Sequence, residues 1–205
     1  MSNGIVFIVD DEEAVRDSID LLVRSAAFQT ETFASAHEFL ASYSAERAGC
    51  LVLDVRMPRM SGLELQQELN RRGWIIPVIF ITGHGDVPMA VEAMREGALD
   101  FLQKPFNDEV LIQRVHMAID HDARQRAQLK AHDELSRRLA TLTPREREIA
   151  DRLVAGQANK VIAIELGLSE RTVEVHRARI MTKLEVRGIA QLVQVLGTVR
   201  EQART

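Results

Sequence analysis

The chain has 205 residues, a net charge of -4 and a single cysteine, Cys50, which excludes a disulfide framework and a cysteine-based zinc site within one chain. This length suits two small domains, and no apolar stretch approaches the length of a membrane span. Because the N-terminus also lacks the basic-then-apolar pattern of a secretion signal, we expect a soluble protein of the cytoplasm without membrane contact.

Charge is distributed unevenly along the chain. Residues 1–120 carry 10 Lys and Arg against 19 Asp and Glu, whereas residues 121–140 and 141–205 have net charges of +2 and +3. An acidic front and a basic rear indicate that the rear contacts a polyanion such as DNA. The alternative is an ordinary solvated helical surface, which often carries a similar charge.

The first 120 residues alternate short apolar runs with amphipathic stretches, a pattern typical of β-α units. The runs are rich in Val, Ile and Phe, as expected of strands buried on both faces, and they span residues 5–9, 29–33, 50–53, 78–81 and 99–102. Five such units predict an α/β doubly wound fold with a five-stranded parallel sheet, right-handed crossovers and helices on both faces.

Polar residues mark where helices begin. Ser35, Ser61 and Thr143 each stand three residues before a glutamate, which fits the capping box. Asp86 is expected to cap a helix that Pro88 begins. These signals indicate the residues at which separate helices begin.

The rear of the chain is predicted to be all-helical. Residues 121–140 are polar, with sparse leucines and neither Gly nor Pro, and predict a mostly exposed helical linker. We therefore expect a domain over 1–120, this linker, and a second domain over 141–205. Its helices are expected at about 144–155, 159–166, 170–184 and 188–199.

Five polar residues stand at the carboxyl ends of the predicted strands. Asp10 and Asp11 follow the first strand, Asp54 and Thr82 end the third and fourth, and Lys104 follows the fifth. In the common strand order 2-1-3-4-5 the strands that carry them are neighbours. The five side chains are therefore expected to converge on one crevice at the switch point of the sheet.

These residue types suit phosphoryl chemistry. Clustered carboxylates repel one another unless a hard cation neutralises them, and oxygen ligands of this kind suit Mg²⁺. Asp54 would attack phosphorus as a carboxylate nucleophile, while Lys104 and Thr82 supply a cation and a hydroxyl donor to the phosphoryl oxygens. Each residue also has an ordinary reading as a cap, strand or surface residue, so the prediction depends on their occurrence together at matching strand ends.

The same strand ends carry motifs of a known family: VDDE at 9–12, LDVRMP at 53–58, ITGHG at 81–85 and KPF at 104–106. With them, residues 3–121 resemble the receiver domain of two-component response regulators. The run TGHGDVPMAVEAM, from 82 to 94, is especially similar to the FixJ branch. The resemblance implies a flavodoxin/CheY-like fold with the strand order 2-1-3-4-5.

By this resemblance, Asp54 is the residue that a sensor histidine kinase phosphorylates. Asp11, Asp54 and the backbone carbonyl of Arg56 are expected to coordinate Mg²⁺, with Asp10 acting largely through water. The Lys104-Pro105 peptide bond is expected to be cis. The protein would take part in its own phosphorylation and dephosphorylation without being a turnover enzyme.

The resemblance also implies a switch. Phe101 occupies the position of an aromatic residue that turns inward when Thr82 moves toward the phosphoryl group; plain core packing of Phe101 is the alternative. Phosphorylation is expected to produce a homodimer, to release a contact between the domains, or to do both. Val91, Arg95 and Asp100 are expected members of the pairing face.

Helices 159–166 and 170–184 are joined by a short turn. Its residues Gly167, Leu168 and Ser169 can end the first helix, plug the core and cap the second helix. Two short helices with such a turn form a helix-turn-helix, whose second helix enters the major groove. In the second helix a stripe of apolar residues is expected to face the core: Val173, Ile180 and Leu184. An amphipathic helix in an ordinary bundle is the alternative.

The motifs LTPRERE at 142–148, NK at 159–160 and TVEVHR at 172–177 make residues 140–200 resemble the LuxR/NarL-type output domain. By this resemblance Glu174, Val175 and Ala178 approach base edges of double-stranded DNA, and RNA polymerase is a further partner. For His176, the alternative to a DNA contact is a structural role at a semi-buried position. Phosphate contacts are expected from Lys160, Thr172, His176, Arg177 and Lys183.

Two other functions compete with a phosphorylation-controlled regulator of transcription. A Mg²⁺-dependent phosphohydrolase of the haloacid dehalogenase type needs a second acid two residues after the nucleophile, where this chain has Arg56. A receiver that binds DNA without being phosphorylated would not need all five pocket residues. Arg56 and His84, at the expected pocket mouth, are predicted to influence how long the phosphoryl group survives.

Overall fold

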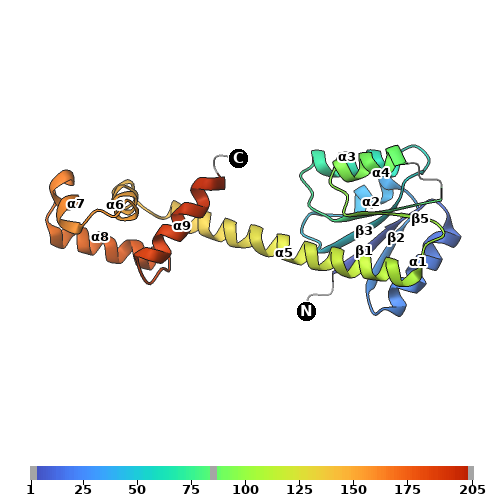
Figure 1. Cartoon of the computed structure of the whole chain (residues 1–205), viewed down its shortest axis with the longest axis horizontal. Helices are drawn as coiled ribbons and strands as arrows, with labels where there is room; N and C mark the ends of the chain where they lie inside the picture. Colours follow the sequence, from blue (N-terminus) through green and yellow to red (C-terminus); the bar gives the residue numbers. More distant parts are fainter. Residues whose placement is uncertain (1–3, 84–86, 203–205) are drawn as a thin grey trace. The chain divides into compact units, whose positions relative to one another are not determined.

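The computed structural model describes residues 4–83 and 87–202, and it divides the chain into two compact units, Met1–Arg126 and Ala127–Thr205 (Figure 1). The expected cap Asp86 and the pocket residue His84 lie outside the described residues. Among the helices in the described ranges, none has both the length and the apolar character needed to cross a bilayer.

The first unit alternates strands and helices as the sequence predicts. Its strands are β1 (Ile5–Val9), β2 (Gln29–Phe33), β3 (Gly49–Asp54), β4 (Val78–Thr82) and β5 (Asp100–Gln103). Its helices are α1 (Glu13–Ser25), α2 (Ala36–Ser42), α3 (Gly62–Arg71), α4 (Val87–Arg95) and the start of α5 (Asp108–Ala140). The strands pair in parallel in the order β2-β1-β3-β4-β5, which confirms the predicted fold and strand order.

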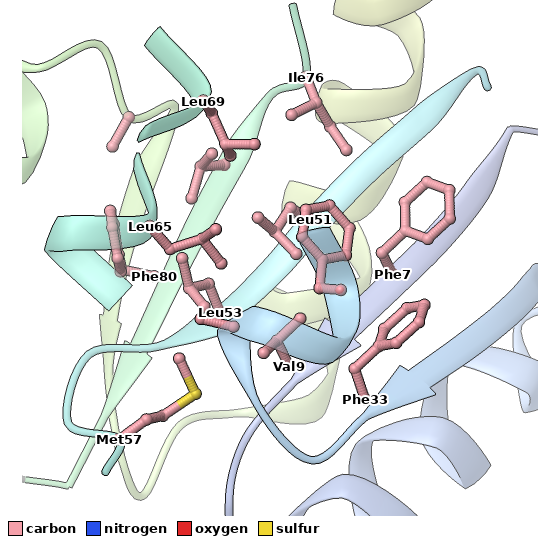
Figure 2. Packing of buried hydrophobic residues seen from close by; sticks show 14 of the residues in the cluster. Phe7, Val9, Phe33, Leu51, Leu53, Met57, Leu65, Leu69, Ile76 and Phe80 are labelled. Carbon is pink, nitrogen blue, oxygen red and sulfur yellow. The ribbon is translucent and has the colours of Figure 1, made fainter. Parts of the chain in front are cut away.

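Side chains alternate between the two faces of the sheet. Val6 and Ile8 of β1 pack with Val52 of β3 under α1 and α5. Phe7 of β1 and Leu51 of β3 point to the other face, into the cluster beneath α2, α3 and α4 that Figure 2 shows. Because all of these side chains are fully buried, each contributes about 1.5–3 kcal/mol of hydrophobic stabilisation.

The helix caps are formed in two different ways. Ser61 and Glu64 make a complete capping box at the start of α3, as predicted. At α2 only half of the box forms: the Ser35 hydroxyl accepts from the Glu38 N–H, but the Glu38 carboxylate accepts from Ala34, one residue earlier than the box requires. Both arrangements satisfy backbone donors that the first helical turn leaves unpaired.

An ion pair in α5 extends the first unit six residues beyond the boundary expected at 120. Asp122 is buried, and its Oδ2 accepts from the Gly49 N–H at 2.9 Å. The Arg126 Nε lies 2.8 and 2.9 Å from the two Asp122 oxygens, and its Nη atoms donate to the carbonyls of Ala45 and Arg47 at 2.6 and 2.7 Å. The pair therefore attaches α5 to the segment between α2 and β3.

Removing the guanidinium should leave a buried carboxylate without a cation. We expect Arg126→Met to lower the free energy of unfolding of the first unit by about 3–5 kcal/mol. The single tryptophan of the chain, Trp74, lies in this unit, so denaturant unfolding followed by its fluorescence measures the loss. Arg124→Met, at an exposed position of the same helix, is the control, and a loss below about 1 kcal/mol for Arg126→Met would contradict the assignment.

The second unit is helical throughout its described part. After the end of α5 it contains α6 (Pro144–Val154), α7 (Asn159–Leu166), α8 (Glu170–Lys183) and α9 (Ile189–Gln202), within three residues of the predicted bounds. Thr143 and Glu146 form the complete capping box predicted for α6. The core comes from every helix and includes Ile149, Ile162, Val173, Ile180 and Leu192, all fully buried.

Candidate functional site

The carboxyl edge of the sheet brings together residues that are far apart in the sequence. Asp10 follows β1, Asp54 is the last residue of β3, and Lys104 follows β5. The Lys104 Nζ lies 2.8 Å from Asp10 Oδ2 and 3.0 Å from Asp54 Oδ1. The predicted convergence of these three side chains is therefore observed.

Backbone groups hold the pocket residues in place. The Glu12 N–H donates to Asp10 Oδ1 at 2.9 Å, and the Arg56 N–H donates to Asp54 Oδ2 at 2.7 Å. The Lys104 N–H donates to the Thr82 carbonyl at 2.7 Å, which joins the ends of β5 and β4. The Lys104-Pro105 peptide bond is cis, as expected. Each carboxylate thus keeps one oxygen on a backbone donor and turns the other toward the lysine.

Burial shapes the electrostatics of this pocket. Asp10 is 1% and Asp54 7% exposed. Burial raises the pKa of Asp54, and the hydrogen bond and charge of Lys104 offset this only in part. Burial by itself favours the neutral amine of Lys104, but its hydrogen bonds to both carboxylates outweigh that effect and raise its pKa. Two carboxylates therefore share one ammonium group, and the pocket keeps an excess of negative charge.

The two residues of the predicted switch lie on the neighbouring strands β4 and β5. Thr82 is buried at the end of β4. Phe101, on β5, is half-buried and packs against the cluster beneath α2, α3 and α4. Its ring centroid lies 6.2 Å from that of Phe80, at an interplanar angle of 40°. Phe101 therefore combines a packed side with an exposed side.

The remaining predicted metal ligands lie at the rim. Asp11 is exposed, and so is the side chain of Arg56, whose backbone carbonyl was the expected ligand. Within residues 4–83 and 87–202, no three carboxylate, imidazole or thiol side chains are gathered around one metal position. The structure thus brings Asp10 and Asp54 together but leaves Asp11 turned to the surface.

The turn between α7 and α8 has the geometry that the sequence predicts. Gly167 ends α7 in the left-handed conformation, with φ 65° and ψ 36°. Leu168 is half-buried against the core of the second unit. The Ser169 Oγ accepts from the Thr172 N–H at 3.0 Å and caps α8. The two helices and this turn form a helix-turn-helix.

The buried and exposed residues of α8 lie on different faces of the helix, as expected. Val173 and Ile180 are fully buried and Leu184 is 2% exposed, which confirms the predicted core stripe. The three residues predicted to read bases are all exposed; they are Glu174, Val175 and Ala178. Their exposure leaves them accessible on the side of α8 opposite the core.

The residues predicted to contact phosphates differ in their exposure and in their hydrogen-bond partners. Lys160 is exposed on α7, and Arg177 is half-buried. The Thr172 hydroxyl lies 2.7 Å from that of Ser169. His176 is half-buried, and its Nδ1 has no hydrogen-bond partner among the described residues.

Lys183 lies in a network that sequence reasoning missed. Its Nζ is 2.6 Å from Oε2 of the buried Glu146 and 2.9 Å from the Thr141 carbonyl. The hydrogen bond from Lys183, followed by that from the Thr143 N–H, lowers the pKa of Glu146 to about 2. No local pattern connects Lys183 to a glutamate 37 residues earlier; the capping box alone marked Glu146.

The depressed pKa of Glu146 predicts acid sensitivity of α6. The carboxylate should stabilise the fold fully above its ordinary pKa of 4.5, and this contribution should be lost as the pH falls toward about 2. We expect Glu146→Gln to lack this pH-dependent component. Hydrogen exchange of α6 amides, corrected for the intrinsic rate at each pH, measures it, with Glu174→Gln at an exposed site as control. Identical pH profiles for the wild type and Glu146→Gln would disprove the prediction.

Family models match both units of the chain. The model of the response regulator receiver domain matches residues 6–116, and the model of the LuxR family of bacterial regulatory proteins matches residues 140–196. A receiver followed by this DNA-binding unit defines the class of phosphorylation-controlled transcription regulators. The chain therefore belongs to the response regulators of the FixJ type.

Similar proteins extend over nearly the whole chain. The transcriptional regulatory protein FixJ of Azorhizobium caulinodans is 47% identical over 93% of this chain and 90% of its own length. The response regulator TodT of Pseudomonas putida is 42% identical over 97% of this chain and 87% of its own. A solved structure of the response regulator StyR has a TM-score of 0.90 and 44% identity, covering 96% of this chain and all of that one.

Proposed function

We propose that Asp54 is the phosphorylated residue of this regulator and that its phosphorylation controls DNA binding by α8. The observation that supports Asp54 most directly is its carboxylate, which is buried at the carboxyl edge of the sheet with Oδ1 3.0 Å from the Lys104 ammonium. Its other oxygen is held by the Arg56 N–H. A carboxylate with little solvent and a fixed direction is a suitable nucleophile.

The proposed reaction is a phosphoryl transfer from a sensor histidine kinase. An Asp54 oxygen forms a bond to phosphorus, the bond between phosphorus and the kinase imidazole breaks, and the imidazole takes up a proton. Lys104 then supplies positive charge to the phosphoryl oxygens, and Thr82 supplies its hydroxyl. Asp10 keeps the lysine ammonium at the pocket during this change.

The donors of the pocket fit a magnesium ion. The carboxylates of Asp10, Asp11 and Asp54 and the Arg56 carbonyl are hard oxygen donors, which Mg²⁺ prefers. Because Asp11 is exposed, its side chain can turn toward the pocket without disturbing the core. When bound, the ion would offset the negative charge that two carboxylates sharing one ammonium leave in the pocket.

Regulation rather than turnover of an external substrate accounts for this pocket. The position two residues after Asp54, where a haloacid dehalogenase phosphatase needs an acid, is the exposed Arg56. Steady release of phosphate from small esters would favour the phosphohydrolase instead. A receiver that works without phosphorylation would leave the buried Asp54 and its paired Lys104 without a use.

The switch is proposed to act on α4 and β5. Inward movement of Thr82 would let Phe101 repack and displace this face. The face has exposed apolar side chains, with Val91 and Met94 at 44% and 48% exposure, which suits contact with a second copy. On β5, Asp100 forms an ion pair with Arg114 of α5 at 2.6 Å, so any pairing there must accommodate or exchange these charges.

In the second unit, α8 is proposed to enter the major groove. Glu174 can accept from cytosine N4, and Val175 and Ala178 can contact a thymine methyl. Phosphate contacts are proposed for Lys160, Thr172, His176 and Arg177. RNA polymerase is proposed as a further partner on the basis of the family, and the cytoplasm is the proposed location.

Replacing the nucleophile should abolish phosphorylation. We expect Asp54→Asn to take up no acid-labile phosphoryl group from acetyl phosphate in the presence of Mg²⁺, because the amide is a poor nucleophile. Intact-mass measurement detects the group directly. Asp17→Asn, at an exposed site of α1, should label normally. Full labelling of Asp54→Asn would refute the assignment.

A charge on the proposed pairing face should prevent dimerisation. We expect Val91→Glu to be phosphorylated normally but to stay monomeric in sedimentation. Its DNA binding should be weaker by up to a few orders of magnitude, because the DNA-binding unit of a second copy is no longer tethered to the first. Leu21→Glu, at a position that is 73% exposed on α1, is the matched control. If phosphorylated wild type binds its operator tightly as a monomer, release of a contact between domains becomes the better mechanism.

A further inference from the structure

The C-terminal end of the reading helix is held by a buried carboxylate. Lys183 is the last residue of α8, and its side chain is 33% exposed, whereas that of Glu146 is 3% exposed. The ammonium lies 2.6 Å from Glu146 Oε2, and it also donates to the Thr141 carbonyl at 2.9 Å. Both acceptors belong to the same unit as α8.

The same contacts join three segments of this unit. Oε2 of Glu146 also accepts from the Thr143 N–H at 2.9 Å, so one oxygen holds the first turn of α6 and the end of α8. Thr141 directly follows α5, and a second link from α5 is made by Arg138, whose Nη1 lies 2.9 Å from Oε2 of Glu185. Lys183 is thus the point where α5, α6 and α8 meet.

Use of this ammonium for a DNA phosphate would be costly. Moving the ammonium away from Glu146 to a phosphate would leave a buried carboxylate without its cation, which is strongly unfavourable. By contrast, Lys160 on α7 is exposed and can reach a phosphate without breaking a contact that the structure describes.

We propose that Lys183 is a positioning residue for DNA recognition and not a phosphate contact. It fixes the C-terminal end of α8 against α6 and the end of α5, while Ser169 and Val173 fix the other end. Without this anchor α8 can tilt about its core contacts and carry its exposed reading residues out of register. The inference rests on the proposed role of α8 in reading DNA.

The salt dependence of binding separates the two roles. The full chain, treated with acetyl phosphate and Mg²⁺, is titrated with a duplex that the wild type selects from random-sequence DNA. A lost phosphate contact reduces the slope of log affinity against log salt concentration by about 0.9. A lost positioning contact lowers affinity at every salt concentration and leaves the slope unchanged.

We expect Lys183→Met and Glu146→Gln each to weaken binding by about tenfold with an unchanged slope. The double variant should be no weaker than the weaker single variant, because both changes remove the same contact. Lys160→Met should reduce the slope, and Lys130→Met, at an exposed site of α5, should change neither quantity.

Glu146→Gln is the decisive variant, since it releases the lysine and keeps its charge. A reduced slope for Lys183→Met together with unchanged or tighter binding by Glu146→Gln would overturn the inference. If the wild type selects no duplex, the proposed function fails, and the inference is then judged by hydrogen exchange of α6 and α8 amides in the same variants. Non-additive loss of protection supports the anchor, and additive loss overturns it.

Discussion

The receiver depends on one lysine ammonium that two buried carboxylates share. Asp10 and Asp54 lie at the ends of neighbouring strands, and Lys104 reaches both from the end of β5. Without a cation the two carboxylates could not be buried side by side, because charge removed from water must be paired. The strand order makes this pairing possible, and the pocket keeps an excess of negative charge. The proposed phosphoryl chemistry uses the same groups: the carboxylate accepts the phosphoryl group, and the ammonium becomes its counter-ion.

Two other buried carboxylates in the described part of the chain are also paired with a cation. Asp122 with Arg126 attaches α5 to the segment before β3, and Glu146 with Lys183 attaches the end of α8 to α6. In each case a carboxylate is almost fully buried, and its cation also donates to a backbone carbonyl. Ion pairs of this kind add little net stability, but a misplaced helix leaves a buried charge unpaired. The cost of an unpaired buried charge therefore favours the observed placement of α5 and α8, and for α8 it supports the proposed role in reading DNA.

Much of the fold could be predicted because it depends on local pattern. Five apolar runs gave the strands nearly to the residue, since strands covered on both faces need continuous apolar sequence. Gly167 and Ser169 placed the turn before α8, because only some residues tolerate a left-handed φ or cap a helix. The capping-box pattern predicted the cap of α2 only in part. Ser35 forms half of the box, since the Glu38 carboxylate accepts from the N–H one residue earlier, that of Ala34. Sequence spacing shows that a carboxylate is within reach, but not which of two neighbouring N–H groups it takes.

By itself the sequence determined the order of elements, the strand ends on which Asp10, Asp54, Thr82 and Lys104 lie, and the core stripe of α8. These follow from periodicity and from the convergence of parallel strand ends at one edge of a sheet. Only the tertiary structure decided which charges meet. It showed Asp11 turned outward, the first unit continuing to Arg126, and Lys183 bound to Glu146 rather than extended into solvent. The reason is physical: a helix pattern specifies the face on which a charged side chain lies, whereas its partner depends on how separate helices pack.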